Sequence, residues 1–96
     1  YNMPVIPCTK DGKSGFMVKN GNKCFTGPGA KKQAEKQLQA IKISQKKRGQ
    51  AVKFNLEEFY KNITVKELAD ILSYANDLTI TEKATIIIDK KHYDKN

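Results

Sequence analysis

The chain has 96 residues, enough for one small domain or for two subdomains that are too small to fold independently. Hydrophobic residues make up 39% of it, Trp is absent, and the formal net charge is +8. Its longest apolar runs have three residues, as in Ile86–Ile88, whereas a membrane span requires roughly 20. We therefore expect no membrane-spanning segment. No grouping of residues typical of an active site is visible, so we expect a protein that is not an enzyme and that needs no cofactor.

The positive charge is concentrated in the first half of the sequence. Residues 1–50 contain 11 Lys or Arg and 2 acidic residues, a net charge of +9. Residues 51–96 contain 7 basic and 8 acidic residues, a net charge of −1. Such a basic half is typical of a protein that contacts a polyanion, and it is equally compatible with a solvated surface.

A β-hairpin is predicted around the dipeptide Asn20-Gly21, which a type I′ turn favours because both central residues take a positive φ angle. We expect strands near 15–19 and 22–26. The preceding segment "PVIPC" is a candidate third strand, and its prolines would confine it to an edge of the sheet. The expected register pairs Val18 with Lys23, Met17 with Cys24 and Phe16 with Phe25.

An amphipathic helix is predicted from about residue 29 to 46, ending near Gly49. The segment Gly27-Pro28-Gly29 ends the preceding strand and places proline near the first helical turn, where it is well tolerated. The expected apolar stripe consists of Ala30, Ala34, Leu38 and Ile41. A different, mostly basic face carries Lys32, Lys36, Ile43, Lys46 and Lys47.

Three capping patterns predict helices in the second half. Asn55-Leu-Glu-Glu58 opens a short helix, and Thr64–Glu67 and Thr79–Glu82 match the capping box. The second helix would run over 65–75. For the third, over about 80–92, the β-branched residues near 84–89 leave a strand open, and helix is preferred. In that helix the residues expected to face inward are Ile80, Ala84, Ile87 and Ile88.

These elements predict an α+β protein with two parts. Residues 1–49 would form the hairpin and the basic helix, and residues 50–96 a helical part that packs as one small domain or docks on a partner. The last two helices are compatible with a helix-turn-helix, but Glu82 in the leading turn of the second suits a phosphate-lined groove poorly, so a helical hairpin is preferred. The side chains expected to supply apolar contacts to a partner are Phe59, Tyr60, Leu68, Leu72 and Ile87.

Cys8 and Cys24 have three possible states. In an oxidising compartment they could form a disulfide. Together with His92 they could supply three zinc ligands, but the fourth ligand is missing. Two free thiols beside the hairpin are the preferred interpretation. We therefore expect no metal site, and His92 is expected to lie at the surface.

The segment "TGPGAKK" is the best candidate binding motif. Backbone N–H groups at a helix N-terminus and the helix dipole both favour an anion, and lysines follow at once. The candidate nucleic-acid or anion-binding residues are Gly27, Gly29, Lys31, Lys32, Lys36, Lys46, Lys47 and Arg48.

About 16 residues, "TGPGAKKQAEKQLQAI", resemble the last strand-to-helix junction of the double-stranded-RNA-binding domain. In that family a Gly-x-Gly loop precedes a Lys-Lys pair and an Ala-rich helix. The resemblance implies that Gly27 and Gly29 form the loop and that Lys31 and Lys32 contact RNA phosphates.

Residues 3–49 resemble small basic proteins of tailed bacteriophages, in which a "GKCYTG" hairpin is followed by an "AKxKAxxQxxAI" helix. The matching segments here are "KDGKSGF", "KCFTGPGAKKQAEKQ" and "AIKISQ". This resemblance implies a non-enzymatic, head-associated virion protein within a multi-subunit assembly. Its partners would be other virion proteins and, as a further candidate, the packaged DNA, and its particle would be assembled in the host cytoplasm. The alternative is a soluble nucleic-acid-binding or regulatory protein that places its basic helix on DNA or RNA phosphates.

Overall fold

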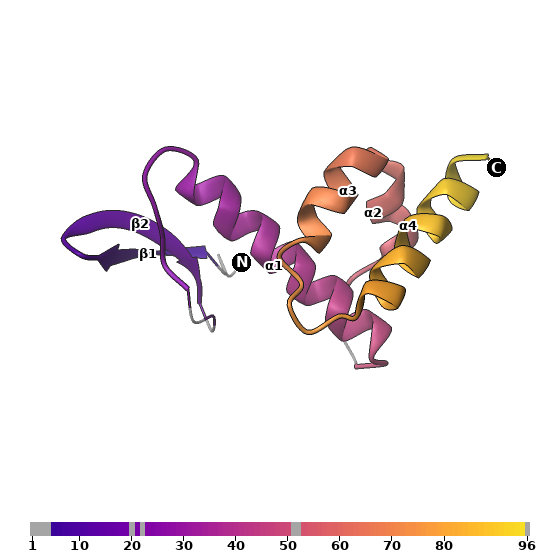
Figure 1. Cartoon of the computed structure of the whole chain (residues 1–96), viewed down its shortest axis with the longest axis horizontal. Helices are drawn as coiled ribbons and strands as arrows, with labels where there is room; N and C mark the ends of the chain where they lie inside the picture. The colour runs from indigo at the N-terminus through magenta and orange to yellow at the C-terminus, as the bar shows by residue number, and fades with distance from the viewer. Residues whose placement is uncertain (1–4, 20, 22, 51–52, 96) are drawn as a thin grey trace. The chain divides into compact units, whose positions relative to one another are not determined.

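The computed structural model describes residues 5–19, 21, 23–50 and 53–95. An antiparallel three-stranded sheet near the N-terminus is followed by helices, which confirms the predicted α+β class (Figure 1). The chain divides into two compact units, residues 1–39 and 40–96. The division falls inside helix α1 (Ala30–Lys47), so α1 contributes its first turns to one unit and its last turns to the other.

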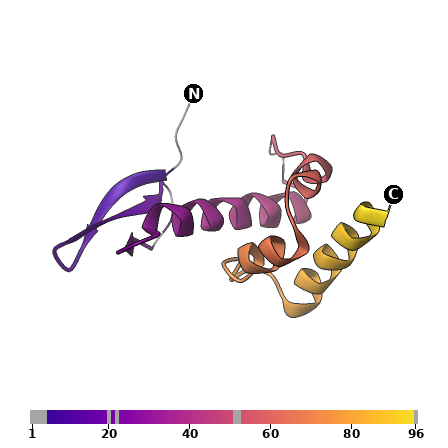
Figure 2. The same ribbon diagram turned by 90° about the horizontal axis from the view of Figure 1, so that it is seen from above.

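Strands β1 (Val5–Lys10) and β2 (Lys13–Val18) form the first hairpin. Asp11 and Gly12 join them with φ angles of 51° and 77°. Positive φ at both central residues is what a type I′ turn requires, and Asp-Gly is one of its favoured dipeptides. Figure 2 shows this hairpin as a two-stranded ribbon that ends in the tight turn. The candidate third strand is thereby confirmed, at an edge of the sheet.

Strand β3 (Phe25–Thr26) pairs with the other side of β2, so the strand order is β1-β2-β3. The predicted pairing of Phe16 with Phe25 is confirmed, but β3 is shorter than the predicted strand over 22–26. Within the described residues, the Gly21 N–H donates a hydrogen bond to the Val18 carbonyl at 2.8 Å. The type I′ turn predicted here depends on Asn20, which lies outside the described residues.

Cys8 and Cys24 form a disulfide, with their Cα atoms 6.0 Å apart. The preferred interpretation as free thiols is therefore wrong. Strand pairing explains the bond: Cys8 lies opposite Gly15 on β2, and Gly15 also pairs with Thr26, two residues after Cys24. The sheet thus brings together two cysteines that are 16 positions apart in sequence.

Helix α1 closely matches the predicted range, and Gly49 follows its end with a φ angle of +76°. Its predicted single apolar stripe is only partly correct. Ala30 and Ala34 are buried as expected, but in the second unit Ile43 is fully buried although it was assigned to the basic face. The reason is that α1 packs within two units, so its buried residues do not follow one stripe. Leu38 and Ile41 are only partly buried.

The second unit contains helices α2 (Leu56–Lys61), α3 (Val65–Leu72) and α4 (Ile80–Lys95). All three predicted caps are present. The Asn55 side chain accepts a hydrogen bond from the Glu58 N–H at 3.1 Å. In both capping boxes the Thr hydroxyl accepts from the Glu N–H and the Glu carboxylate accepts from the Thr N–H. Local sequence therefore determines where these helices begin.

Helix α4 confirms the preference for helix over strand at 84–89, but its predicted inward face is only partly correct: Ile87 packs against the core, whereas Ile80, Ala84 and Ile88 are exposed. Ile80 and Ile88 are 86% and 53% exposed, whereas Ile86 is fully buried and Lys90 is 4% exposed. The Lys90 ammonium group donates to the Asp94 carboxylate, so its aliphatic stem can be buried while its charge is paired. Because Lys90 is a charged residue type, the spacing of hydrophobic residues along α4 does not indicate that this face of the helix is buried.

The residues expected to supply apolar contacts to a partner lie in or against the core of the second unit. Tyr60, Leu68 and Leu72 are buried there, and Phe59 and Ile87 pack against the same cluster while partly exposed. Leu68 and Ile86 lie at its centre with no exposed surface. These apolar side chains therefore stabilise the helices of their own unit.

Candidate anion-binding surface

The first unit carries a basic surface, which we define by its six exposed lysines. Seven lysines and two acidic residues fall within residues 1–39, a net charge of +5. Both acidic residues, Asp11 and Glu35, are exposed. The exposed lysines of this basic surface are Lys10, Lys13, Lys19, Lys23, Lys31 and Lys32.

The start of α1 matches the geometry expected of the "TGPGAKK" motif. Gly27 and Gly29 have φ angles of +83° and +78°, and neither would meet another atom within 4 Å if it carried a Cβ. Glycine is required here by the backbone angle and not by lack of space. Lys31 and Lys32 follow in the first turn, which contains no acidic residue. The positive end of the helix dipole and the exposed side chains of Lys31 and Lys32 therefore lie at the same end of α1.

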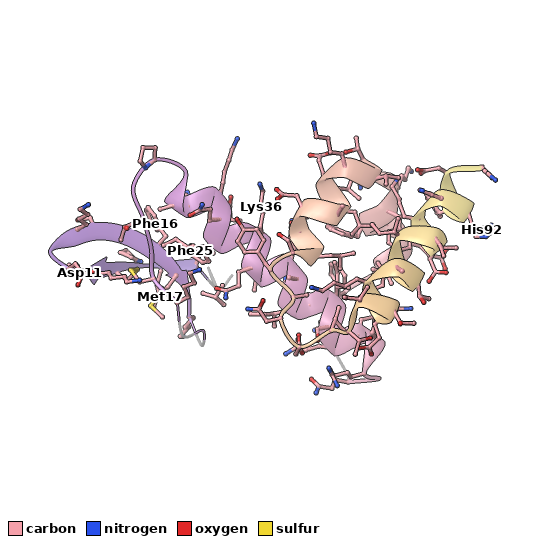
Figure 3. The ribbon with its side chains drawn as sticks, in the orientation of Figure 1. Asp11, Phe16, Met17, Phe25, Lys36 and His92 are labelled. Carbon is pink, nitrogen blue, oxygen red and sulfur yellow. A yellow bond between two sulfur atoms is a disulfide. The ribbon has the colours of Figure 1, made fainter. Side chains whose placement is uncertain are left out.

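Lys36, also in the predicted set, lies farther along α1 in the first unit, as Figure 3 shows. It is partly buried and makes an interaction of its own within the chain. The exposed lysines of the first turn are therefore better placed to meet a partner.

The tip of the first hairpin adds two lysines that sequence reasoning missed. Lys10 and Lys13 lie directly opposite each other on β1 and β2, beside the turn that carries Asp11 (Figure 3). Like charges in directly opposite positions repel, which a bound anion would relieve. The same rule that identified Asn20-Gly21 as a turn applies to Asp11-Gly12, so the sequence contained the signal for this pair.

Lys23 lies near an aromatic ring, with its ammonium nitrogen 5.3 Å from the Phe25 ring centroid. Phe25 is buried, so the ring provides a fixed surface that restrains an exposed cation. This contact orients the side chain of Lys23, one of the six lysines of the basic surface.

The last three residues of the predicted set, Lys46, Lys47 and Arg48, belong to the second unit. Lys47 forms an ion pair with Asp89 at 3.5 Å, and the Arg48 guanidinium is 3.5 Å from the Asp77 carboxylate. Arg48 also donates to the Asp77 carbonyl. Lys46 is exposed and lines an open groove of about 550 Å³. Two of these three cations are thus paired with carboxylates of their own unit.

The perturbed acid–base groups have structural causes. Burial, with a smaller contribution from Asp89, raises the pKa of Tyr60 to about 12. The Thr79 backbone N–H lowers the pKa of Glu82, as expected for a carboxylate in a capping box. Among the described residues, no group of three His, Cys, Asp or Glu side chains could hold a metal ion. His92 is exposed.

Comparison with known proteins identifies no family for this chain. No protein-family model, curated protein or solved structure matches this chain. Within the part of the chain that the structure describes, no helix is long and apolar enough to cross a membrane.

Proposed function

We propose that the chain is a non-enzymatic accessory structural protein of a bacteriophage particle. Its first unit would hold an acidic partner there, either the surface of another virion protein or the packaged DNA. The observation that carries this proposal is the basic surface: six exposed lysines lie in a unit with only two acidic residues. The resemblance of residues 3–49 to small phage proteins supports the location in a particle.

Two places on the basic surface suit a polyanion. The first turn of α1 offers backbone N–H groups together with Lys31 and Lys32. The hairpin tip offers the repelling pair Lys10 and Lys13. Binding of a polyanion to such cations releases counterions, so the affinity should fall steeply as salt increases.

The anion contact is tested by titrating the chain with duplex DNA and duplex RNA at several salt concentrations. Changing Lys31 and Lys32 together to Gln should reduce the slope of log affinity against log salt by about 1.8 for duplex DNA. The control changes Lys66 and Lys91, two exposed lysines of the second unit, to Gln. An equal loss in both double variants would show that only net charge matters and would contradict a localised surface.

The structural role is tested separately by looking for the chain in purified phage particles. A particle component sediments with the particles and stays with them through a salt wash that removes loosely bound protein. A soluble regulatory protein would bind nucleic acid in the first experiment and be absent from particles in the second. That combination would contradict the proposed structural role and favour the alternative.

A further inference from the structure

The disulfide between Cys8 and Cys24 joins the two outer parts of the sheet in the first unit. Cys8 lies on β1 and Cys24 directly precedes β3, while β2 lies between these strands and pairs with both. Both cysteine residues are partly exposed, and both belong to the same compact unit. The bond therefore restrains the arrangement of the whole sheet.

The other interactions that stabilise this sheet are few. Strand β3 has two residues, and each forms one pair with β2. Among the described residues of the first unit, the buried apolar side chains are Val18, Phe25, Ala30 and Ala34, of which two are alanines. A unit of about 40 residues buries little apolar surface, so disulfides or metals usually stabilise it. No group of three side chains that could hold a metal ion is found in the part of the chain that the structure describes. The stability of the first unit therefore depends on the disulfide.

The second unit does not depend on this bond. It contains no cysteine, and Ile43, Leu68 and Ile86 are fully buried in its core. Loss of a native disulfide from a small domain often abolishes its folding. Reduction should therefore open the first unit and leave the second unit folded.

The disulfide also lies among the lysines of the basic surface. Lys23 directly precedes Cys24, and Lys10 follows Cys8 by two positions and lies opposite Lys13. These side chains carry like charges, so their repulsion favours an open chain over a compact one. The bond opposes that repulsion by holding the two segments that carry these lysines together.

We propose that the Cys8–Cys24 disulfide is a redox switch that controls the basic surface, an inference that rests on the function proposed for that surface. When the bond is intact, the first unit is folded and its lysines form one surface. When a dithiol reductant cleaves the bond, the unit opens and the surface is lost. Cytosolic thiols are kept reduced, so the surface forms once the chain has left a reducing compartment.

The cleavage is an ordinary thiol–disulfide exchange. A thiolate of the dithiol attacks one of the two sulfur atoms, which forms a mixed disulfide and releases the other cysteine as a thiolate. The second thiol of the reductant then displaces the remaining cysteine. Two electrons and two protons reach Cys8 and Cys24, and the dithiol becomes a disulfide.

The first test compares amide hydrogen exchange of the full chain before and after treatment with dithiothreitol, with complete reduction verified by thiol alkylation and mass spectrometry. The exchange rates of the β1 and β2 amides should rise by at least about tenfold and at most about 100-fold, the factor that the loop-entropy model gives for a cross-link over 16 positions. The amides of α3 should keep their rates and serve as the control within the same molecule. Unchanged rates in β1 and β2 after reduction, or a bond that dithiothreitol does not reduce in the folded chain, would overturn the proposal.

A double variant separates loss of the bond from other effects of the reductant. Cys8→Ser combined with Cys24→Ser should exchange like the reduced wild type and should not respond to dithiothreitol. If the double variant kept the exchange rates of the oxidised wild type in β1 and β2, the bond would not be what holds the sheet, and the proposal would be wrong.

The second test measures the affinity for duplex DNA in both redox states by fluorescence anisotropy. Thiols are mostly protonated at neutral pH, so reduction leaves the net charge nearly unchanged and any loss of affinity reflects the arrangement of the lysines. The reduced chain should bind DNA several-fold more weakly. The difference in affinity between the Lys31/Lys32 and the Lys66/Lys91 double variants should also shrink on reduction.

The outcomes distinguish failure of the switch from failure of the proposed function. Equal DNA affinity of the oxidised and the reduced chain would overturn the switch and leave the anion contact of the proposed function intact. No affinity in either state would contradict the anion contact itself, and the switch with it.

Discussion

The carbonyl oxygen of Phe25 occupies the space that a side chain at Gly15 would need: a Cβ there would lie 1.8 Å from that oxygen. Gly15 is one of two positions, with Phe16, at which β2 pairs with both neighbours; its partners are Cys8 on one side and Thr26 on the other. The obstacle is backbone, so it cannot be relieved by a change of rotamer. The close approach of these two strands therefore depends on glycine at this position.

The first prediction concerns this contact. Gly15→Ala should destabilise the first unit by more than about 3 kcal/mol, because the strands must separate to admit the methyl group. The control Gly29→Ala meets no atom and should cost only about 1 kcal/mol, for its positive φ angle. Amide hydrogen exchange of β2 measures both effects. Similar protection in the two variants would contradict the prediction.

The corrected face of α4 provides a second prediction with its own matched pair. Ile86→Ala removes a fully buried side chain and should cost about 2–5 kcal/mol of unfolding free energy. Ile88→Ala alters a side chain that is 53% exposed, two positions away, and should change stability by no more than about 0.5 kcal/mol. Urea unfolding would distinguish them. If Ile88→Ala were the more costly change, the observed face would be wrong.

A third prediction follows from the raised pKa of Tyr60. The neutral hydroxyl is favoured in the folded chain, so the stabilisation is complete below about pH 10 and is lost as the pH rises toward 12. Between about pH 9 and 11.5 the wild type should lose about 2 kcal/mol more stability than Tyr60→Phe. Urea unfolding at both pH values measures this difference. Parallel losses in the two proteins would rule out Tyr60 as the cause.

The hairpin tip supplies the fourth prediction. Asp11→Asn keeps a residue that suits the positive φ angle and removes the only acidic group of the tip, so duplex DNA should bind several-fold more tightly. Lys13→Gln should act in the opposite direction on binding, while relieving its repulsion with Lys10 and so stabilising the hairpin. Fluorescence anisotropy with labelled DNA measures the affinities. Unchanged affinity in both variants would show that the tip lies outside the contact.

Much of the local structure could be predicted from short-range patterns. The caps at Asn55, Thr64 and Thr79 depend on side chains only three residues away, so they were identified correctly. The Phe16–Phe25 pairing and the length of α1 also followed from local rules. The candidate site was predicted in part: Lys31 and Lys32 are exposed beside the positive-φ glycines, while Lys10 and Lys13 were missed.

By itself, the sequence determined the turns, the helix starts and the concentration of charge in the first half, because each depends on residues close together in the chain. Tertiary structure alone decided the Cys8–Cys24 bond, since two extended segments had to be paired before the sulfur atoms could meet. It also decided that Lys47 and Arg48 form ion pairs with distant carboxylates, and that Ile86 and Lys90 are buried in place of Ile80 and Ile88. Burial depends on which surface packs against a helix, and a pattern along one helix does not contain that information.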